Sequence, residues 1–402
     1  MVIGGDIAKA LRRTFELQDL RHARLLSMEG LRGFAVILVF LQHYCRQALL
    51  IGLPDGATLT FTNVFRNYGN LGVELFFVIS GYLIYGTLVR KSPHFLTFMA
   101  RRYQRIYPAF LVVFAFALAL TVLTPIPGKI PDGPWHAAAY LAANLALLPG
   151  LFPIVRIVDV AWSLSYEMFF YFAISALVLG LGLGQVQAQR RVAVLSVLTL
   201  AFIGALFFPI PFFPERMLPF FAGMLLAEGV GNRVPAWAGW LLPLGAFTAS
   251  ATGLLSGPFI LGEMVHTVAF FAMCAVCFRE VGLITAVMSW TPLRWLGNMS
   301  YSYYLAHGFV VRIAMVVIAK FLHGAMPLTL FWALMPVLFV ATLAVSAVLF
   351  VTVEKRFSLR TPMSREKELS TEWAAAEAHH QEAGGVAIDG AVPQGQRVTF
   401  SR

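Results

Sequence analysis

A succession of long apolar runs constrains this chain more than any other feature. Each run has about the twenty residues that an α-helix needs to cross the hydrocarbon of a bilayer, and the runs follow one another along most of the sequence. Of the 402 residues, 59% are hydrophobic and 12% are charged, whereas a soluble domain has about 25% charged residues. A β-barrel would show short alternating segments instead. The sequence therefore predicts an all-α polytopic membrane protein.

The apolar runs predict about ten transmembrane helices and one re-entrant or interfacial segment at 136–152. The expected spans are 31–52, 70–90, 105–125, 162–184, 191–210, 214–231, 236–255, 259–279, 299–322 and 327–352. Residues 1–30 form a basic N-terminal segment without an expected cleavable signal peptide. Residues 31–357 form the transmembrane domain, and residues 358–402 form a polar, largely disordered tail.

The placement of the cations predicts how the chain is oriented. If segment 136–152 does not cross the membrane, the basic loops, the basic N-terminal segment and the C-terminal tail all fall on one side, as the positive-inside rule requires. We therefore expect both termini in the cytoplasm and a multi-pass protein of the inner (plasma) membrane. The net charge of +10 then reflects topology and contact with anionic membrane lipids, and no nucleic-acid partner is expected.

A histidine within the first span is the first candidate for chemistry. Arg32 and His43 are eleven positions apart, which is a rise of roughly 16 Å on a helix, so His43 falls near the middle of the bilayer if Arg32 lies at its surface. An ionisable side chain at that depth is expensive and usually functional. An imidazole also exchanges a proton near neutral pH. The alternative is a structural histidine that is hydrogen-bonded to a neighbouring helix.

Six strings in this order resemble the acyltransferase-3 family of integral membrane acyltransferases, from about residue 28 to residue 357. The strings are Arg32 and His43 separated by ten residues; Phe76-Phe77-Val78-Ile79-Ser80-Gly81; Arg102-x-x-Arg105 before Tyr107-Pro108; Trp162-Ser163-Leu164 with Glu167; Ser300-Tyr301 with Tyr304-Leu305 and His307; and Glu354 at the end of the last span. The resemblance implies transfer of an acyl group, usually acetyl, from a coenzyme A thioester. The implied acceptor is a sugar hydroxyl of a surface polysaccharide, a lipid-linked glycan or a glycosylated metabolite.

Acyl transfer to a hydroxyl needs a proton acceptor, stabilisation of an oxyanion and a donor held in line. We assign His43 as the general base and Glu167 as its orienting or substrate-binding partner. Transfer that is direct and transfer through an acyl-His43 intermediate both remain open. Arg102 and Arg105 lie one helical turn apart, and two guanidiniums match a pyrophosphate. The resemblance also points to this pair for coenzyme A, although anchoring to lipid headgroups is the alternative for both.

Further residues complete the expected site. Arg32 and His307 join the acyl-CoA site, with the same headgroup alternative for Arg32. The acceptor is expected near the outer side, where the substrate-binding candidates are Glu74, Ser80, Trp162, Tyr166 and Tyr301. Glu74 is alternatively a solvated rim residue, Ser80 a small packing residue, and Trp162 and Tyr166 members of an aromatic belt at the interface. For Glu354, at the end of the last span, the alternative to a role in the site is an ion pair with its neighbours Lys355 and Arg356.

Other chemistries find less support in the sequence. It contains no G-x-S-x-G elbow, no Walker loop and no Cys/His metal cluster, so neither a serine nucleophile nor a metal is expected. Cys274 and Cys277 have C-x-x-C spacing but are better explained as small packing residues. The alternative function is a proton-coupled transporter that uses His43 and Glu167. The two halves of the chain show no inverted repeat that would favour it.

Overall fold

The computed structural model describes residues 9, 11–16, 26–54, 56–68, 70–124, 130–255, 259–322 and 324–359, without the side chains of residues 67 and 68. The chain divides into one unit over Met1–Ser358 and another over Leu359–Arg402. The predicted C-terminal tail and most of the predicted basic N-terminal segment lie outside the described residues. All elements below belong to the first unit.

The described residues form helices and no strands. The first half contains α2 (Leu26–Ile51), α3 (Ala57–Tyr68), α4 (Leu71–Lys91), α5 (Phe95–Leu123), α6 (Pro134–Leu145), α7 (Ala161–Gly180), η1 (Leu183–Gln185) and α8 (Ala188–Ala205). The second half contains η2 (Glu215–Met217), α9 (Leu218–Ala227), η3 (Val230–Arg233), α10 (Ala238–Ala251), α11 (Phe259–Phe278), α12 (Gly282–Met288), α13 (Thr291–Asn298), α14 (Ser300–Phe321), α15 (Leu328–Leu349) and η4 (Phe350–Ser358).

Among the described residues, eight stretches are long and apolar enough to cross a membrane. They are α2, the α3–α4 stretch, α5, α7, α8, α11, α14, and α15 with η4. This confirms the all-α polytopic prediction, although two of the ten expected spans are shorter than predicted. The region 214–231 contains the ten-residue α9, and 236–255 contains the fourteen-residue α10. These helices are about 15 and 21 Å long, less than the ~30 Å of a bilayer core.

These two helices are shortened by breaks in the backbone. A hydropathy profile does not detect such breaks. Pro219 stands in the first turn of α9, and Gly229, with a φ of +80°, follows its end. Segment 136–152 behaves similarly, because the twelve-residue α6 is succeeded by turns through Pro149 and Gly150. Its length of about 18 Å is too short for a full crossing, as the re-entrant interpretation expects.

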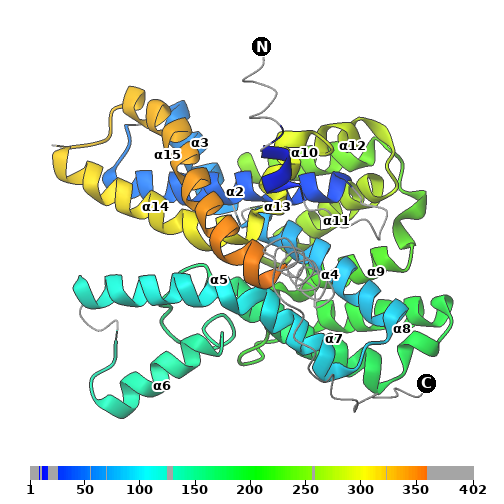
Figure 1. The fold of residues 1–402 in the computed structure, drawn as a ribbon. Helices are drawn as coiled ribbons and strands as arrows, with labels where there is room; N and C mark the ends of the chain where they lie inside the picture. Colours follow the sequence, from blue (N-terminus) through cyan, green and yellow to red (C-terminus); the bar gives the residue numbers. More distant parts are fainter. Residues whose placement is uncertain are drawn as a thin grey trace, which may run out of the picture. The chain divides into compact units, whose positions relative to one another are not determined.

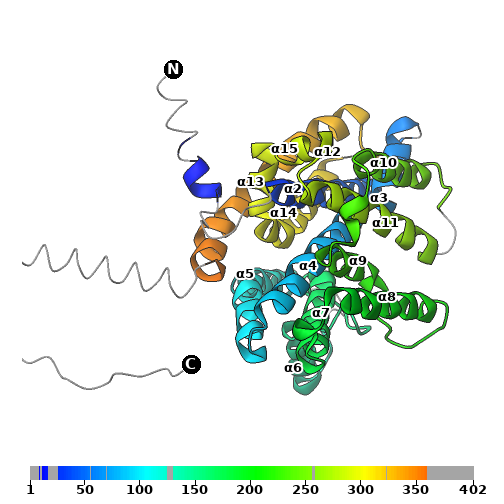
Figure 2. The ribbon, with the colours of Figure 1, turned by 90° about the vertical axis from the view of Figure 1, so that its right-hand side faces the viewer.

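Helix α2 lies in the middle of the helical unit, where it packs against α4, α13 and α14 (Figures 1 and 2). Two glycines bring α2 and α13 into close contact. A methyl group on Gly33 would lie 2.0 Å from the Leu293 carbonyl oxygen, and one on Gly297 would lie 1.7 Å from the Glu29 carbonyl oxygen. Only glycine allows this approach, which is the usual role of small residues between membrane helices.

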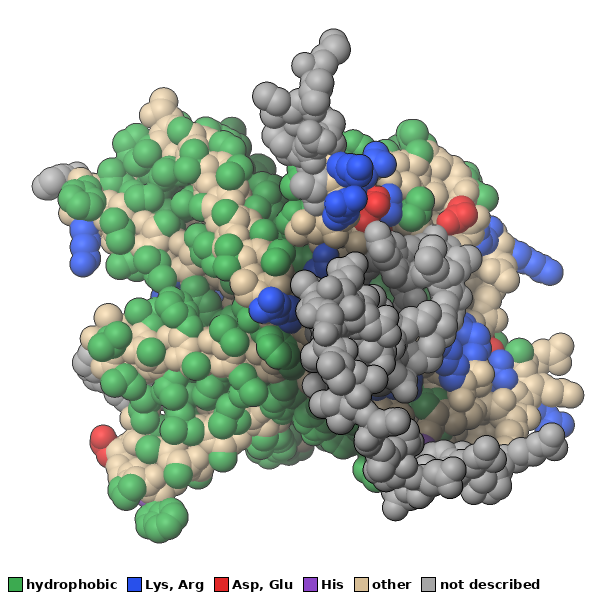
Figure 3. All heavy atoms as spheres, in the orientation of Figure 1, with side chains coloured by type: hydrophobic (Ala, Val, Ile, Leu, Met, Phe, Trp, Pro, Cys, Tyr) green, Lys and Arg blue, Asp and Glu red, His purple; other side chains and the backbone are tan. Residues whose placement is uncertain are grey.

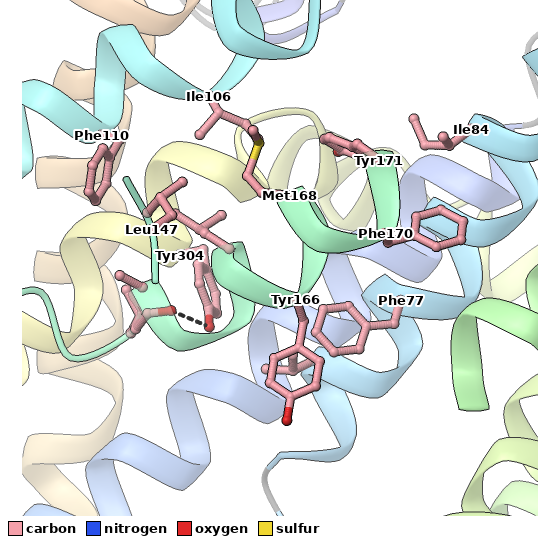
Figure 4. Packing of buried hydrophobic residues seen from close by; sticks show 14 of the residues in the cluster. Phe77, Ile84, Ile106, Phe110, Leu147, Tyr166, Met168, Phe170, Tyr171 and Tyr304 are labelled. Atoms are coloured by element: carbon pink, nitrogen blue, oxygen red, sulfur yellow. Dashed lines mark hydrogen bonds between the residues drawn. The ribbon is translucent and has the colours of Figure 1, made fainter. Parts of the chain in front are cut away.

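The outward faces of the long helices are apolar, as lipid contact requires. Figure 3 shows hydrophobic side chains over much of α5, α14 and α15, while Lys and Arg gather elsewhere on the same face. The interior contains an aromatic cluster in which the Phe77 ring of α4 stacks on that of Tyr166, with 6.2 Å between the centroids (Figure 4). Phe77 also stacks on Phe220, with 4.3 Å between the centroids. This cluster holds α4, α7 and α9 together around the polar residues described below.

Candidate active site

A cavity lined by three arginines lies between α2, α4, α5, α7 and α14. We call it the arginine cavity; its volume is about 180 Å³. Its polar lining comprises Arg32, Ser80, Arg102, Arg105, Ser163, Glu167, Tyr171, Ser300, Tyr301 and Tyr304. The structure thus brings together residues expected to bind the donor (Arg32, Arg102 and Arg105), to bind the acceptor (Ser80 and Tyr301) and to orient the base (Glu167), without the base His43 itself.

Two of the arginines are held by partners on other helices. The Arg32 Nη2 donates to Ser300 Oγ at 2.8 Å. Arg105 forms a 2.7 Å ion pair with Glu354, whose carboxylate also accepts from the backbone N–H and hydroxyl of Ser302, at 3.0 and 2.5 Å. Glu354 is fully buried, and it pairs with Arg105 instead of with its neighbours Lys355 and Arg356. The π-type winding of η4 is a local geometry that often marks functional positions.

Arg102 lacks such a pairing. Its guanidinium lies 5.3 Å from the centre of the Phe98 ring and 5.9 Å from that of Tyr171, and its Nε is buried with no hydrogen-bond partner among the described residues. A buried guanidinium N–H without an acceptor is costly. The site therefore has an unfilled requirement for an acceptor, and a phosphate oxygen would meet it.

Glu167, the expected orienting or substrate-binding partner of His43, lies in the arginine cavity. Its Oε1 accepts from Ser80 Oγ at 3.4 Å and from Tyr171 Oη, and it does not line the cavity that contains His43. The neighbouring residue Gly81 is the one that allows α4 and α9 to pack closely here, because a methyl group on it would lie 2.3 Å from the Phe220 carbonyl oxygen. The hydroxyl of Ser80 is therefore a polar contact of Glu167, beyond the packing role considered for it.

His43 lines a second, larger cavity of about 390 Å³, which we call the histidine cavity. The other polar residues around it are Gln42, Arg46, Gln47, Asn70, Arg156, Asp159, Trp162, Tyr304 and Arg312. Eleven residues are about three helical turns, so Arg32 and His43 project from the same side of α2, each into its own cavity. Val73 and Tyr304 line both cavities, which makes these two residues the boundary between them.

Tyr304 is fixed in place at this boundary. Its hydroxyl donates to the Val160 carbonyl oxygen at 3.0 Å and contacts Ser163 Oγ at 2.6 Å. These bonds tie α14 to the first turn of α7. The position of the boundary therefore follows from the docking of two helices that are far apart in the sequence.

His307 packs against His43 and does not line the arginine cavity, where the sequence predicts it. The two imidazole rings are 4.8 Å apart and perpendicular to each other. The His307 Nδ1 is 2.8 Å from the Tyr303 carbonyl oxygen. Because a carbonyl can only accept, Nδ1 carries the proton and Nε2 of the neutral ring is left as an acceptor. This Nε2 is buried without a hydrogen-bond partner among the described residues.

Two expected acceptor residues lie outside both cavities. Glu74 is buried, with its carboxylate 3.9 Å from Arg216, so it is not a solvated rim residue. The Tyr166 ring packs against Phe77 (Figure 4) and also contacts the Trp162 ring. Trp162 and Tyr301 do line cavities, the histidine cavity and the arginine cavity respectively. Trp162 therefore shares a cavity with His43, and Tyr301 shares one with Arg32, Arg102 and Arg105.

Sequence reasoning missed several cations of the histidine cavity. Arg46 follows His43 by one helical turn, and Arg312 lies inside a predicted span. Both positions carry a usable signal, because helical spacing and intramembrane charge each indicate function. The position of Arg156 carries no such signal, because Arg156 belongs to a loop. No group of three or more His, Cys, Asp or Glu that could hold a metal ion occurs in the described part of the chain.

Comparison with known proteins places the chain in a family. The sequence model of a family described as an acyltransferase domain matches residues 25–351. The acyltransferase MdmB of Streptomyces mycarofaciens is 26% identical over 327 residues, which are 73% of this chain and 80% of MdmB. The exopolysaccharide production protein ExoZ of Rhizobium meliloti is 28% identical over 61% of this chain and 77% of its own length.

A third relative is longer than this chain. The putative peptidoglycan O-acetyltransferase YrhL of Bacillus subtilis is 25% identical over 73% of this chain, but the match spans only 49% of YrhL. No solved structure matches. The family match covers both cavities and His43, Arg102 and Glu167 within them. This chain belongs to the acyltransferase-3 family and is a membrane acyltransferase.

Proposed function

We propose that the protein transfers an acyl group, acetyl in the simplest case, from acyl-CoA to a sugar hydroxyl, with His43 as the general base. The observation that carries this proposal is the pair of cavities that meet at Val73 and Tyr304. One is rich in arginine and the other contains an intramembrane imidazole. A donor and an acceptor that enter from opposite sides would meet at this boundary.

The arginine cavity is suited to the phosphates of coenzyme A. Arg32 and Arg105 are pre-oriented by Ser300 and Glu354, and Arg102 has an unfilled N–H. Charge-assisted bonds from guanidinium to phosphate are among the strongest in proteins. The cations bind the phosphates near the protein surface, and the thioester extends toward Tyr304. Lipid headgroup anchoring does not account for the buried Nε of Arg102.

In the histidine cavity, His43 takes the proton from the acceptor hydroxyl as its oxygen attacks the thioester carbonyl. The tetrahedral intermediate collapses, the carbon–sulfur bond breaks, and the coenzyme A thiolate receives the proton from His43. His307 acts through His43 as a positioning residue, because the two rings pack perpendicular to each other with 4.8 Å between their centres. Trp162 provides a flat apolar face for the sugar.

The direction of transfer follows from the charge pattern. Basic loops predict that the end of the bundle with Arg102 and Arg105 faces the cytoplasm, where acyl-CoA is made. The histidine cavity then opens toward the outer side. We therefore propose an inner-membrane location with both termini cytoplasmic. The printed names of YrhL and ExoZ, a putative peptidoglycan O-acetyltransferase and an exopolysaccharide production protein, support a carbohydrate acceptor.

The test uses purified protein in lipid nanodiscs with labelled acetyl-CoA and a glycan fraction from the native envelope. His43→Ala should abolish transfer to the glycans while acetyl-CoA binding persists, because His43 does not line the arginine cavity. Arg102→Gln should weaken acetyl-CoA binding about tenfold at low salt and less at high salt. Folded His43→Ala protein with wild-type turnover would refute the mechanism. Turnover without any acyl-CoA would favour another donor.

A further inference from the structure

An apolar cavity between α5 and α14 has no role in the mechanism above. Its volume is about 340 Å³, and its walls are mostly aliphatic, including Leu120 of α5 and Ile313 of α14. It shares four residues with the histidine cavity, namely His43, Gln47, Asp159 and Arg312. His43 therefore lies where a polar cavity and an apolar cavity join.

The apolar cavity opens sideways toward lipid. Ile313, Val316 and Val317 line it and are also among the exposed apolar side chains, which on a spanning helix face hydrocarbon. The surface is hollowed between the ridges of α14 and α5 (Figure 3). At one edge Phe309 meets Phe116 of α5, with ring centroids 5.7 Å apart. A hydrocarbon chain already in the bilayer can enter here without passing through water.

The adjoining histidine cavity is positively charged. Arg46, Arg156 and Arg312 line it with one carboxylate, Asp159. Arg312 pairs with Asp159 at 3.2 Å, and within the described part of the chain no ion pair engages Arg46 or Arg156. Two arginines without carboxylate partners favour an anionic group on whatever occupies this space.

We propose that the acceptor is an anionic amphiphile, a glycan joined through phosphate to a long hydrocarbon chain. The chain lies in the apolar cavity, the phosphate lies against Arg46 and Arg156, and a sugar hydroxyl reaches His43. This proposal rests on the proposed function and names its substrate class. The chain belongs to the acceptor and not to the acyl group of the donor, because the apolar and arginine cavities share no lining residue.

Photocrosslinking tests the occupant without relying on turnover. The probe is an alkyl phosphate with a diazirine midway along its chain, added to protein in phosphatidylcholine nanodiscs; the matching alkanol carries the same diazirine. We expect the phosphate probe to label peptides from 117–124 and 305–317. Ile313→Trp should remove most of this labelling by filling the cavity. Val340→Trp is the control, because Val340 is also an exposed apolar residue, on α15, and lines none of the three cavities.

The charge requirement is tested with the Arg46→Gln and Arg156→Gln double variant. Labelling by the phosphate probe should fall about tenfold, the effect of losing a charge-assisted contact, while labelling by the alkanol stays unchanged. Equal labelling of wild type by both probes would overturn the proposal. So would displacement of the probe by long-chain acyl-CoA but not by excess alkyl phosphate, because the cavity would then hold the donor chain.

Failure of the proposed function gives a different result. His43→Ala should retain most of the labelling by the phosphate probe even when transfer is lost, because Arg46, Arg156 and the aliphatic walls of the apolar cavity stay in place. If His43→Ala retains transfer, the base assignment fails while the labelling pattern still decides the occupant. If transfer is lost and α5 and α14 are not labelled, the base assignment stands and the amphiphile proposal falls.

Discussion

Substitution of His307 tests the proposed positioning of the general base. Asn at this position keeps an N–H that can donate to the Tyr303 carbonyl oxygen, as Nδ1 does at 2.8 Å, but places nothing where Nε2 stands. Gln places a polar group near the Nε2 position. His307→Asn therefore removes the ring that packs against His43, whereas His307→Gln keeps a longer side chain in that space.

The expected loss of kcat follows from the buried contact between His307 and His43. His307 is fully buried, and its ring lies 4.8 Å from that of His43. An edge-to-face ring contact of this kind contributes about 0.5–1.5 kcal/mol, which corresponds to a roughly 2- to 13-fold lower kcat. The KM for acyl-CoA should stay near the wild-type value, because His307 does not line the arginine cavity. His307→Gln should recover part of the lost kcat.

Steady-state transfer in nanodiscs measures both constants, and thermal unfolding reports the fold. His266→Asn is a matched control, since His266 is a buried histidine on α11 that contacts Ser250 and lines none of the three cavities. Wild-type kcat in His307→Asn would refute the positioning role. If the Asn and Gln variants lose kcat equally and both have a lower Tm, His307 is instead a packing residue.

Two further predictions concern packing and the donor site. Glu354→Gln leaves Arg105 without its ion pair, so we expect about 3 kcal/mol lower stability and a raised KM for acyl-CoA; an unchanged Tm and KM would contradict this. Gly297→Ala should destabilise by about 1–3 kcal/mol, as overpacking does, because its methyl meets the Glu29 carbonyl oxygen. Gly245→Ala is the control, since nothing lies within 4 Å of a methyl there, and its Tm should not fall.

Much of the bundle and part of the site could be predicted from local patterns. Apolar run length predicted the polytopic helical fold, because spanning hydrocarbon sets a minimum length. The spacing of Arg32 and His43, and of Arg102 and Arg105, fixes each pair on one helix face. Proline and glycine breaks inside apolar runs explain why α9 and α10 are shorter than the expected spans.

Residues whose partners come from distant helices could not be assigned in the same way. The sequence predicts that Glu167 is a partner of His43, but α7 directs Glu167 into the arginine cavity, whereas His43 lines the histidine cavity. Glu354 was considered a partner of Lys355 and Arg356, yet it binds Arg105 and Ser302. His307 was assigned to the donor, and it lies behind His43.

The sequence alone determined that the chain is a bundle of apolar helices and predicts a titratable group, His43, within one of its spans, because hydrophobic length and helical rise are properties of single segments. Tertiary structure decided which side chains share a cavity and where the two cavities meet. That boundary at Val73 and Tyr304 depends on how α4, α7 and α14 pack around α2. Such packing arises from contacts between residues far apart in the chain, which no local spacing encodes.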